Sequence, residues 1–244
     1  MADNFDALLN ALPLILEGLI ITLQLTVGGA ILAMATAVVL GVLAQQDNIL
    51  LRGFARVIIE FFRGTSLVVQ LFWLFFVLPQ FGLSFPAMAV GIAALGLNYG
   101  AYGAEIVRGS INSVPAGQWE ATTALSLSKL QGMRRVIFPQ AWALMIPSLS
   151  NLLVHLLKGT AIVSFITMAD LTFRIDQLRV DTNTFFAYGV GLVLYFLIAY
   201  VLTLAMNALE ARAKHKLGRG VSLPEALNLR SADTGVTSST KEHV

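Results

Sequence analysis

The stretch LILEGLIITLQLTVGGAILAMATAVVLGVLA, residues 14–44, decides the fold class of this chain. Its only charged side chain is Glu17. A helix needs about 20 apolar residues to cross the hydrocarbon core of a bilayer, and its backbone amides must find partners within the same helix there. The stretch therefore predicts a membrane-spanning α-helix.

Composition extends this interpretation to most of the chain. Hydrophobic residues make up 57% of the 244 residues and charged residues 12%, whereas soluble domains carry about a quarter charged residues. We therefore expect an all-α polytopic membrane protein with five transmembrane helices. They are expected at residues 14–44, 66–78 with an amphipathic lead-in from about residue 54, 87–106, 141–157 extending to about 168, and 185–209.

The placement of Lys and Arg predicts the orientation, because cytoplasmic connections are enriched in these residues. The connection after the first span is basic, the next has no charge, and the third is basic again, as is the segment after the last span. This alternation predicts an N-terminus outside and a C-terminus in the cytoplasm, and it fits an odd number of spans. A transmembrane domain is expected over residues 1–220, followed by a polar, disordered tail at 221–244.

Several functions are disfavoured by what the sequence lacks. It has no cysteine for disulfides or thiolate metal sites, no constellation of metal ligands, and no GxxxxGK[ST] phosphate loop. Its basic residues lie between apolar runs, which argues against a nucleic-acid partner. We expect a subunit that is not itself an enzyme and holds no cofactor or metal of its own.

Small residues recur at four-residue spacing in two predicted spans. Such ridges let helices approach closely in lipid, and we interpret them as packing within the chain rather than as a subunit interface. The ridges are Gly29, Ala33, Ala37 and Gly41 in the first span, and Gly96, Gly100 and Ala104 in the third.

The third connection, about residues 113–139, reads as a structured element and not as a linker. Pro115 suits the first turn of a helix, and residues 117–125 are expected to be helical. Ser128 and Gln131 have the spacing of a capping box that opens a second helix, and Pro139 marks entry into the fourth span. A helix–turn–helix on a cytoplasmic loop indicates a docking surface for another subunit.

This connection resembles the EAA loop of ABC importer permeases. Residues 117–139 read GQWEATTALSLSKLQGMRRVIFP. Glu120 and Ala121 match the start of the family pattern, and Pro139 lies at the expected distance from them. The departures are Thr122 for Ala, Ser126 for Gly, Val136 for Ile and Phe138 for Leu. Ser126 matters most, because serine is poorly suited to a positive φ.

Three further stretches are similar to the polar-amino-acid (histidine, glutamine and arginine) branch of these permeases. They are EFFRGTSLVVQLFW at 60–73, YGAEIVRGSINSVPAGQWEA at 102–121 and LLKGTAIVSFI at 156–166, where Gly159 stands in place of the Asp that many members have. The resemblance implies a type I importer transmembrane domain and a second permease subunit, identical or homologous. It also implies a location in the bacterial plasma (inner) membrane, an external solute-binding protein and two cytoplasmic ATPase subunits that hold ATP and magnesium. The residues expected to couple to the ATPase are Gly117, Glu120, Ala121, Ser126 and Pro139.

The fourth span carries a polar stripe of Ser148, Asn151, His155 and Lys158, at steps of three, four and three residues. This spacing places them on one helix face. Polar groups at membrane depth are costly and usually line a pathway; the alternative is hydrogen bonding between helices. We assign the stripe to the solute pathway and add Gln70, Asn98 and Tyr99 as further polar side chains that face either the pathway or a neighbouring helix.

The sequence also bears on gating and on the substrate. Glu60 with Arg63, and Glu105 with Arg108, are acid–base pairs at three-residue spacing, interpreted as a structural or gating network. Gly159 in place of Asp removes a negative charge, which favours a zwitterionic solute over a cationic one. The alternatives are an ectoine-like compatible solute as substrate, an ion-gradient-driven transporter, and a membrane scaffold that transports nothing.

Overall fold

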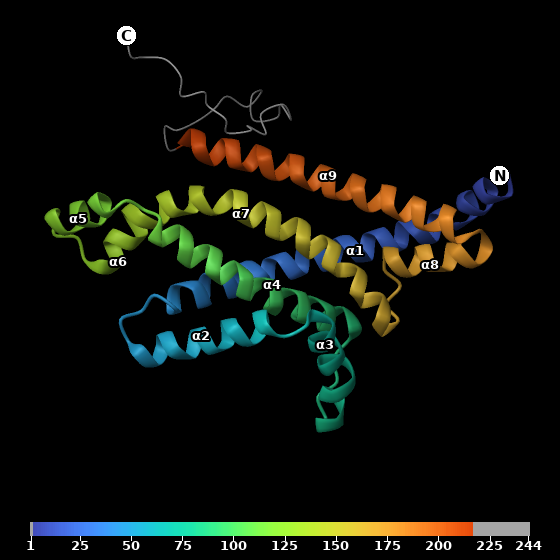
Figure 1. The fold of residues 1–244 in the computed structure, drawn as a ribbon, viewed down its shortest axis with the longest axis horizontal. Helices are drawn as coiled ribbons and strands as arrows, with labels where there is room; N and C mark the ends of the chain where they lie inside the picture. The colour runs from blue at the N-terminus through green and yellow to red at the C-terminus, as the bar shows by residue number, and fades with distance from the viewer. Residues whose placement is uncertain (1, 217–244) are drawn as a thin grey trace, which may run out of the picture.

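The computed structural model describes residues 2–216 and, within them, the side chains of residues 4–212. The described part is helical (Figure 1). Its long helices are α1 (Ala2–Leu43), α4 (Ala87–Asn112), α7 (Phe138–Gly159) and α9 (Thr184–Lys216). The shorter helices are α2 (Ile49–Gly64), α3 (Leu67–Phe72), α5 (Ala116–Ala124), α6 (Lys129–Gly132) and α8 (Leu171–Asp181). Two π turns, η1 (Trp73–Val77) and η3 (Met133–Ile137), and two 3₁₀ segments, η2 (Leu78–Phe81) and η4 (Thr160–Ile166), complete the described helices.

The long helices lie side by side and give the molecule two distinct ends (Figure 1). Helices α5 and α6 gather at one end, next to the connection between α1 and α2. The start of α1 and helix α8 lie at the opposite end. The predicted docking element and the fourth connection are therefore separated by the full length of the bundle.

Helices α1 and α4 pack closely along their small-residue ridges. A Cβ atom added to Gly96 would lie 2.6 Å from the side chain of Leu32, and one added to Gly100 would lie 2.6 Å from Thr36. No side chain larger than hydrogen fits at these positions without moving a helix. The prediction that the ridges pack within the chain is confirmed.

The fourth predicted span begins earlier than expected. Helix α6, the π turn η3 and α7 follow one another without a break, so the helical stretch starts at Lys129 and not at residue 141. Pro139 has no N–H to donate, and in a regular helix its ring meets the carbonyl four residues earlier. The wider turn just before it, in which the N–H of Phe138 bonds to the carbonyl of Met133, accommodates the proline. Pro139 thus modifies a continuous helix and does not start one.

The second predicted span is sharply bent. Its lead-in is α2, which begins at Ile49 where Asn48 caps it and not near residue 54. A break at Thr65 and Ser66 separates α2 from the segment α3–η1–η2, and the two parts meet at 102°. The predicted lead-in is present, but it starts five residues earlier than residue 54 and meets the following segment at a corner that the sequence pattern did not predict.

The described residues contain three helical stretches that are long and apolar enough to span a membrane alone: Asn4–Leu43, Lys129–Ile166 and Thr184–Arg212. The bent pair of α2 and α3–η2 gives a fourth if it counts as one span. Helix α4 has 26 residues but carries Asn98, Tyr99 and Glu105, which lower its apolar character. The number of five spans therefore stays a prediction. The tail at 221–244 and the domain boundary at residue 220 lie outside the described residues.

Candidate functional site

The third connection forms the expected helix–turn–helix. Helix α5 ends in a Schellman motif: the N–H of Ser126 bonds to the carbonyl of Thr123 at 2.9 Å, and the N–H of Leu127 to the carbonyl of Thr122 at 3.0 Å. Ser126 has a φ of 54°, so the position does require the left-handed conformation in which glycine is least strained. The serine therefore keeps the turn but carries backbone strain.

The second half of the element is capped and tied to its surroundings. The Ser128–Gln131 capping box is present in both directions, at 3.0 and 3.3 Å. The ammonium of Lys129 lies 2.6 Å from the carboxylate of Asp47 in the α1–α2 connection, and this contact holds the pKa of Asp47 below its usual value. The amide of Gln140 in α7 donates to the Gln118 side chain of α5 at 3.0 Å. The docking element is thus joined to α7, through which a displacement can pass into the bundle.

Much of the surface of this element is exposed in the described chain. The five residues predicted to couple to an ATPase, Gly117, Glu120, Ala121, Ser126 and Pro139, are all exposed. Three large apolar side chains, Trp119, Leu125 and Leu130, are exposed beside them. Exposed apolar groups next to an acidic residue are typical of a protein-binding surface.

The polar stripe of α7 lies on the outer face of the helix. Ser148, Asn151, His155 and Lys158 are all exposed, whereas Met145, Leu149 and Leu156 of the same helix are buried. No side chain of the stripe makes a hydrogen bond or ion pair with the described residues. The alternative explanation of the stripe, bonding between helices of this chain, is not what the geometry shows.

Comparison with known proteins identifies the family. Residues 37–215 match the model of the "Binding-protein-dependent transport system inner membrane component". The chain belongs to this family. A probable amino-acid ABC transporter permease protein of Sinorhizobium fredii is 44% identical over 204 residues, covering 80% of this chain and 85% of that protein. The L-cystine transport system permease protein of Bacillus subtilis is 33% identical over 202 residues, covering 82% and 86%.

A solved structure agrees with the family. The crystal structure of an amino acid ABC transporter with histidines contains a chain that is 34% identical to this one and superposes with a TM-score of 0.79. The match covers 85% of this chain and 98% of that chain. The all-α fold of a type I importer permease is therefore confirmed, as is a multi-pass membrane protein that serves as a transport subunit and not as an enzyme.

The departure from the family pattern at Gly159 has a structural reason. The hydroxyl of Tyr99 in α4 donates to the backbone carbonyl of His155 at 2.9 Å, which places the ring over the end of α7. A Cβ atom at Gly159 would lie 2.5 Å from that hydroxyl. An aspartate at position 159 is therefore incompatible with this position of Tyr99. Tyr99, predicted as a pathway residue, lies at the end of the polar stripe.

Gln70 and Asn98 lie away from the stripe, at the corner between α2 and α3. The Gln70 amide donates to the hydroxyl of Thr65 at 2.6 Å and to the carbonyl of Phe62 at 3.0 Å. The Asn98 amide donates to the same carbonyl at 2.9 Å and to the Gln70 side chain at 3.3 Å. Both side chains are buried. Of the two roles considered for them, their contacts favour bonding to a neighbouring helix, and we call this cluster the corner clasp.

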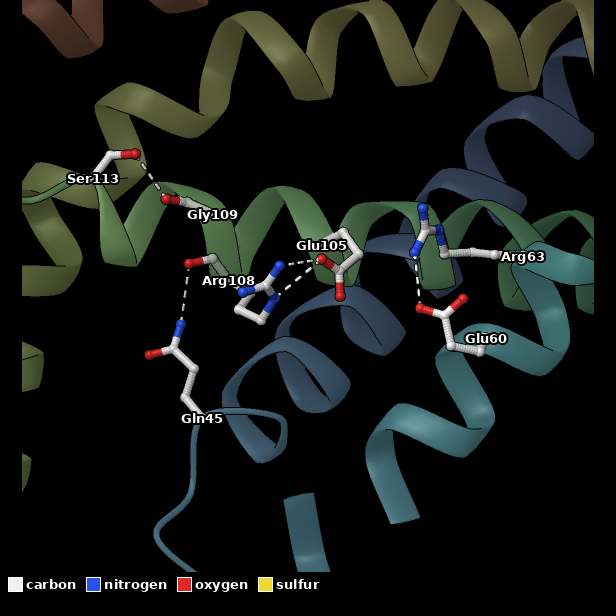
Figure 2. A network of polar contacts seen from close by, with 7 residues as sticks. All are labelled: Gln45, Glu60, Arg63, Glu105, Arg108, Gly109 and Ser113. Atoms are coloured by element: carbon white, nitrogen blue, oxygen red, sulfur yellow. Dashed lines mark hydrogen bonds and ion pairs between the residues drawn. The ribbon is translucent and has the colours of Figure 1, made fainter. Parts of the chain in front are cut away.

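The two predicted ion pairs are present, each within its own helix (Figure 2). Arg63 lies 3.1 Å from Glu60 in α2, and Arg108 lies 2.6 Å from Glu105 in α4. Gln45, at the end of α1, donates to the backbone carbonyl of Arg108 at 3.3 Å. The pairs neutralise charge locally and do not themselves bridge α2 and α4. Neither pair takes part in the polar stripe.

Sequence reasoning missed the role of Asp170. This residue precedes α8, where its carboxylate accepts from the N–H of Phe173 at 3.0 Å as a helix cap. It is fully buried, its second oxygen lacks a partner among the described residues, and burial raises its pKa to about 6. The hydroxyl of Thr22 in α1 accepts from the N–H of Leu171 at 3.1 Å. An aspartate just before a stretch with helical apolar periodicity signals the start of a helix. The sequence could therefore have predicted the cap, but not the burial of the carboxylate.

Proposed function

We propose that this chain is the membrane-spanning permease subunit of an ATP-driven importer for a polar amino acid. The observation that carries the proposal is the docking element: two capped helices at one end of the bundle, with Glu120 and Trp119 exposed and with a side-chain link to α7. The chain has no phosphate loop of its own, so ATP and magnesium belong to partner subunits that dock there. The names of its relatives supply the substrate class.

The proposal includes a complete set of partners. A second permease subunit, identical or homologous, completes the pathway. Two ATPase subunits bind from the cytoplasm, one to the docking element of each permease. An external binding protein delivers the solute to the opposite end, where the start of α1 and α8 lie. The N-terminus is then outside and the docking element inside, as the basic connections predict.

The solute path runs along the polar stripe. The side chains of Ser148, Asn151, His155 and Lys158 are exposed in the single chain and make no hydrogen bond or ion pair with the described residues. Leaving these groups against lipid costs a few kcal/mol for a charge. Apposition of two such faces in a permease pair would provide a hydrated lumen that avoids this cost. Gln70 and Asn98 stay secondary candidates, because their amides already bond the backbone.

We infer a zwitterionic substrate. Gly159 removes the carboxylate that many relatives carry, and Tyr99 presents a neutral ring in its place. Lys158, which precedes Gly159 in the sequence, suits the carboxylate of an amino acid. A compatible solute such as ectoine shares this charge pattern, but no relative named above points to it. An ion-gradient-driven transporter would leave the docking element without a purpose.

Charge reversal at the docking element tests the proposal. Glu120→Lys should reduce co-purification of the ATPase subunit at least tenfold, because a positive charge replaces the carboxylate at the proposed contact with the ATPase. Asp181→Lys makes the same change at an exposed site at the far end and should leave co-purification unchanged. Normal assembly of the Glu120→Lys complex would show that this carboxylate is only a solvated surface group.

Orientation is tested by labelling single cysteines in intact cells, since the chain has none. Thr123→Cys lies on the exposed part of α5, and Val180→Cys lies on the exposed part of α8. An impermeant thiol reagent should label only the second from outside. Labelling of both from the same side would contradict the topology.

A further inference from the structure

A polar cavity opens between the end of α1, helix α2 and helix α4. It measures about 220 Å³ and is lined by Ala44, Gln45, Arg52, Arg56, Arg108 and Asn112. A single water needs roughly 10–15 Å³ of such space, so a hydrated phosphate group fits. We call this the arginine pocket.

The arginine pocket has excess positive charge. Arg52 and Arg56 lie one turn apart on α2, and neither side chain makes a hydrogen bond or ion pair within the part of the chain that the structure describes. Two acids on which the charge of these arginines acts are already paired with other residues. Asp47, on which the charge of Arg52 acts, is held by Lys129 at 2.6 Å. Glu105, on which the charge of Arg56 acts, is held by Arg108 at 2.6 Å.

The arginine side chain is well suited to bind phosphate. Its planar guanidinium presents several donors that match the oxygens of a phosphate. Arg108 gives its Nε and one terminal nitrogen to Glu105, which leaves the other terminal nitrogen without a bond in the structure. Three guanidinium groups and the Asn112 amide therefore border one cavity. This donor set favours a ligand with two or three anionic oxygens.

The other face of α2 places this pocket at a lipid surface. Leu50, Phe54, Val57 and Phe61 follow one another at steps of four, three and four residues, and all are exposed. The two arginines lie about half a turn away from that stripe. An apolar face with a basic face behind it is typical of a helix at the boundary between lipid tails and headgroups.

The pocket lies at the docking end of the molecule. The contact between Asp47 and Lys129 joins the α1–α2 connection, beside the pocket, to α6. If the proposed orientation holds, the pocket faces the cytoplasmic leaflet, where anionic lipids attract basic residues near the membrane surface.

We propose that the arginine pocket binds the phosphate of an anionic phospholipid, with the acyl chains against the apolar stripe of α2. The leaflet assignment rests on the proposed function; the binding itself does not. Bound there, the headgroup bridges α2 and α4 beside the docking element and neutralises the unpaired arginines.

Lipid retention by the purified full-length chain tests this. The protein is placed in nanodiscs of phosphatidylcholine with a minor fraction of phosphatidylglycerol, and bound lipid is counted by native mass spectrometry. Arg52→Gln with Arg56→Gln should lower retained phosphatidylglycerol at least fivefold. Arg134→Gln with Arg135→Gln, which removes two exposed arginines at the same end of the molecule, should change it less than twofold.

Asn112→Asp provides a second variant that keeps every arginine. A carboxylate at this exposed position should repel the phosphate and lower retention at least threefold without removing a helix contact. Retention equal to wild type in both pocket variants would overturn the proposal. A similar loss in the Arg134 and Arg135 control would overturn it too, because general positive charge would then explain the binding.

Two further arms separate the sources of the anion. In discs of phosphatidylcholine alone, radiolabelled inorganic phosphate should not bind measurably, because it lacks the chains that α2 holds; saturable binding lost in the double arginine variant would identify a free-phosphate site instead. In the same discs, loss of ATPase co-purification in the double variant would identify a protein contact. Neither arm nor the lipid count measures transport, so failure of this proposal is distinguishable from failure of the proposed importer.

Discussion

The polar stripe of α7 and the corner clasp are both clusters of polar side chains in the membrane part of the chain, but they differ in their exposure and in their hydrogen bonds. The amides of Gln70 and Asn98 are buried and bond to Phe62, to Thr65 and to each other. The four side chains of the stripe are exposed and bond to nothing within the described residues. A polar group that the fold already satisfies serves the fold, whereas one that it leaves open needs something from outside.

The largest effect expected from this difference is on transport. Asn151→Leu should lower uptake per assembled complex at least tenfold, because the solute loses a polar contact on the exposed face, and it should change the melting temperature little since no internal bond is lost. Uptake in vesicles, divided by the amount of assembled complex, is the measurement.

Leu153→Ala is the matched control two residues along the helix. Leu153 borders an apolar cavity between α1, α7 and α9, so its truncation should cost packing stability and leave uptake per complex near wild type. Equal transport defects in the two variants would remove the reason to assign the stripe to the pathway.

Asp170 is a third kind of polar group, buried with one carboxylate oxygen that has no hydrogen-bond partner among the described residues. Its pKa is raised from 3.8 to about 6, so the folded state holds the proton more tightly than the unfolded state. Stability should therefore fall as pH rises from about 4 through 6, by roughly 2–3 kcal/mol in all. Asp170→Asn keeps a cap and should flatten this dependence, measured by thermal unfolding in detergent across that range. A slope equal to wild type would assign the pH dependence to other groups.

Asn98→Leu tests the clasp with the same substitution that tests the stripe. It removes the hydrogen bonds that the Asn98 amide donates to the carbonyl of Phe62 and to the side-chain oxygen of Gln70. A buried polar group without a partner costs about 1–3 kcal/mol, and we expect a loss of that size in thermal unfolding. If Asn98→Leu and Asn151→Leu destabilise the chain equally, the distinction between the clasp and the stripe fails.

The smallest effect is expected at Ser126. Its φ of 54° suits glycine better than serine. A left-handed backbone costs a non-glycine residue about 1–2 kcal/mol, the greater unfolded-state freedom of glycine offsets about 0.5–1 kcal/mol of that, and a net gain of about 0.5–1 kcal/mol remains. Ser126→Gly should raise the unfolding temperature slightly and keep ATPase association. Ser126→Ala is the control, because it removes the hydroxyl and keeps the strain. Destabilisation by glycine would indicate that the serine side chain makes a contact of its own in the assembled complex.

Features that depend on neighbours along the chain could be predicted from the order of the residues. Apolar length decided that the chain crosses the membrane, since a helix satisfies its own backbone in lipid. The spacing of Ser128 and Gln131 predicted a capping box, and the three-residue spacing of Glu60 and Arg63 predicted their ion pair. All of these are local interactions, so the order of residues is enough to predict them.

Only the tertiary structure decided what each polar residue meets across the bundle. Asn98 and Asn151 look equivalent in the sequence, but one lies at a 102° corner and the other on an open face. A side chain at position 159 would clash with Tyr99, which is 60 positions earlier in the chain. Such contacts depend on the paths of separate helices. The small-residue ridges predict that helices pack closely, but the spacing of residues along one helix does not say which side chains of another helix it meets.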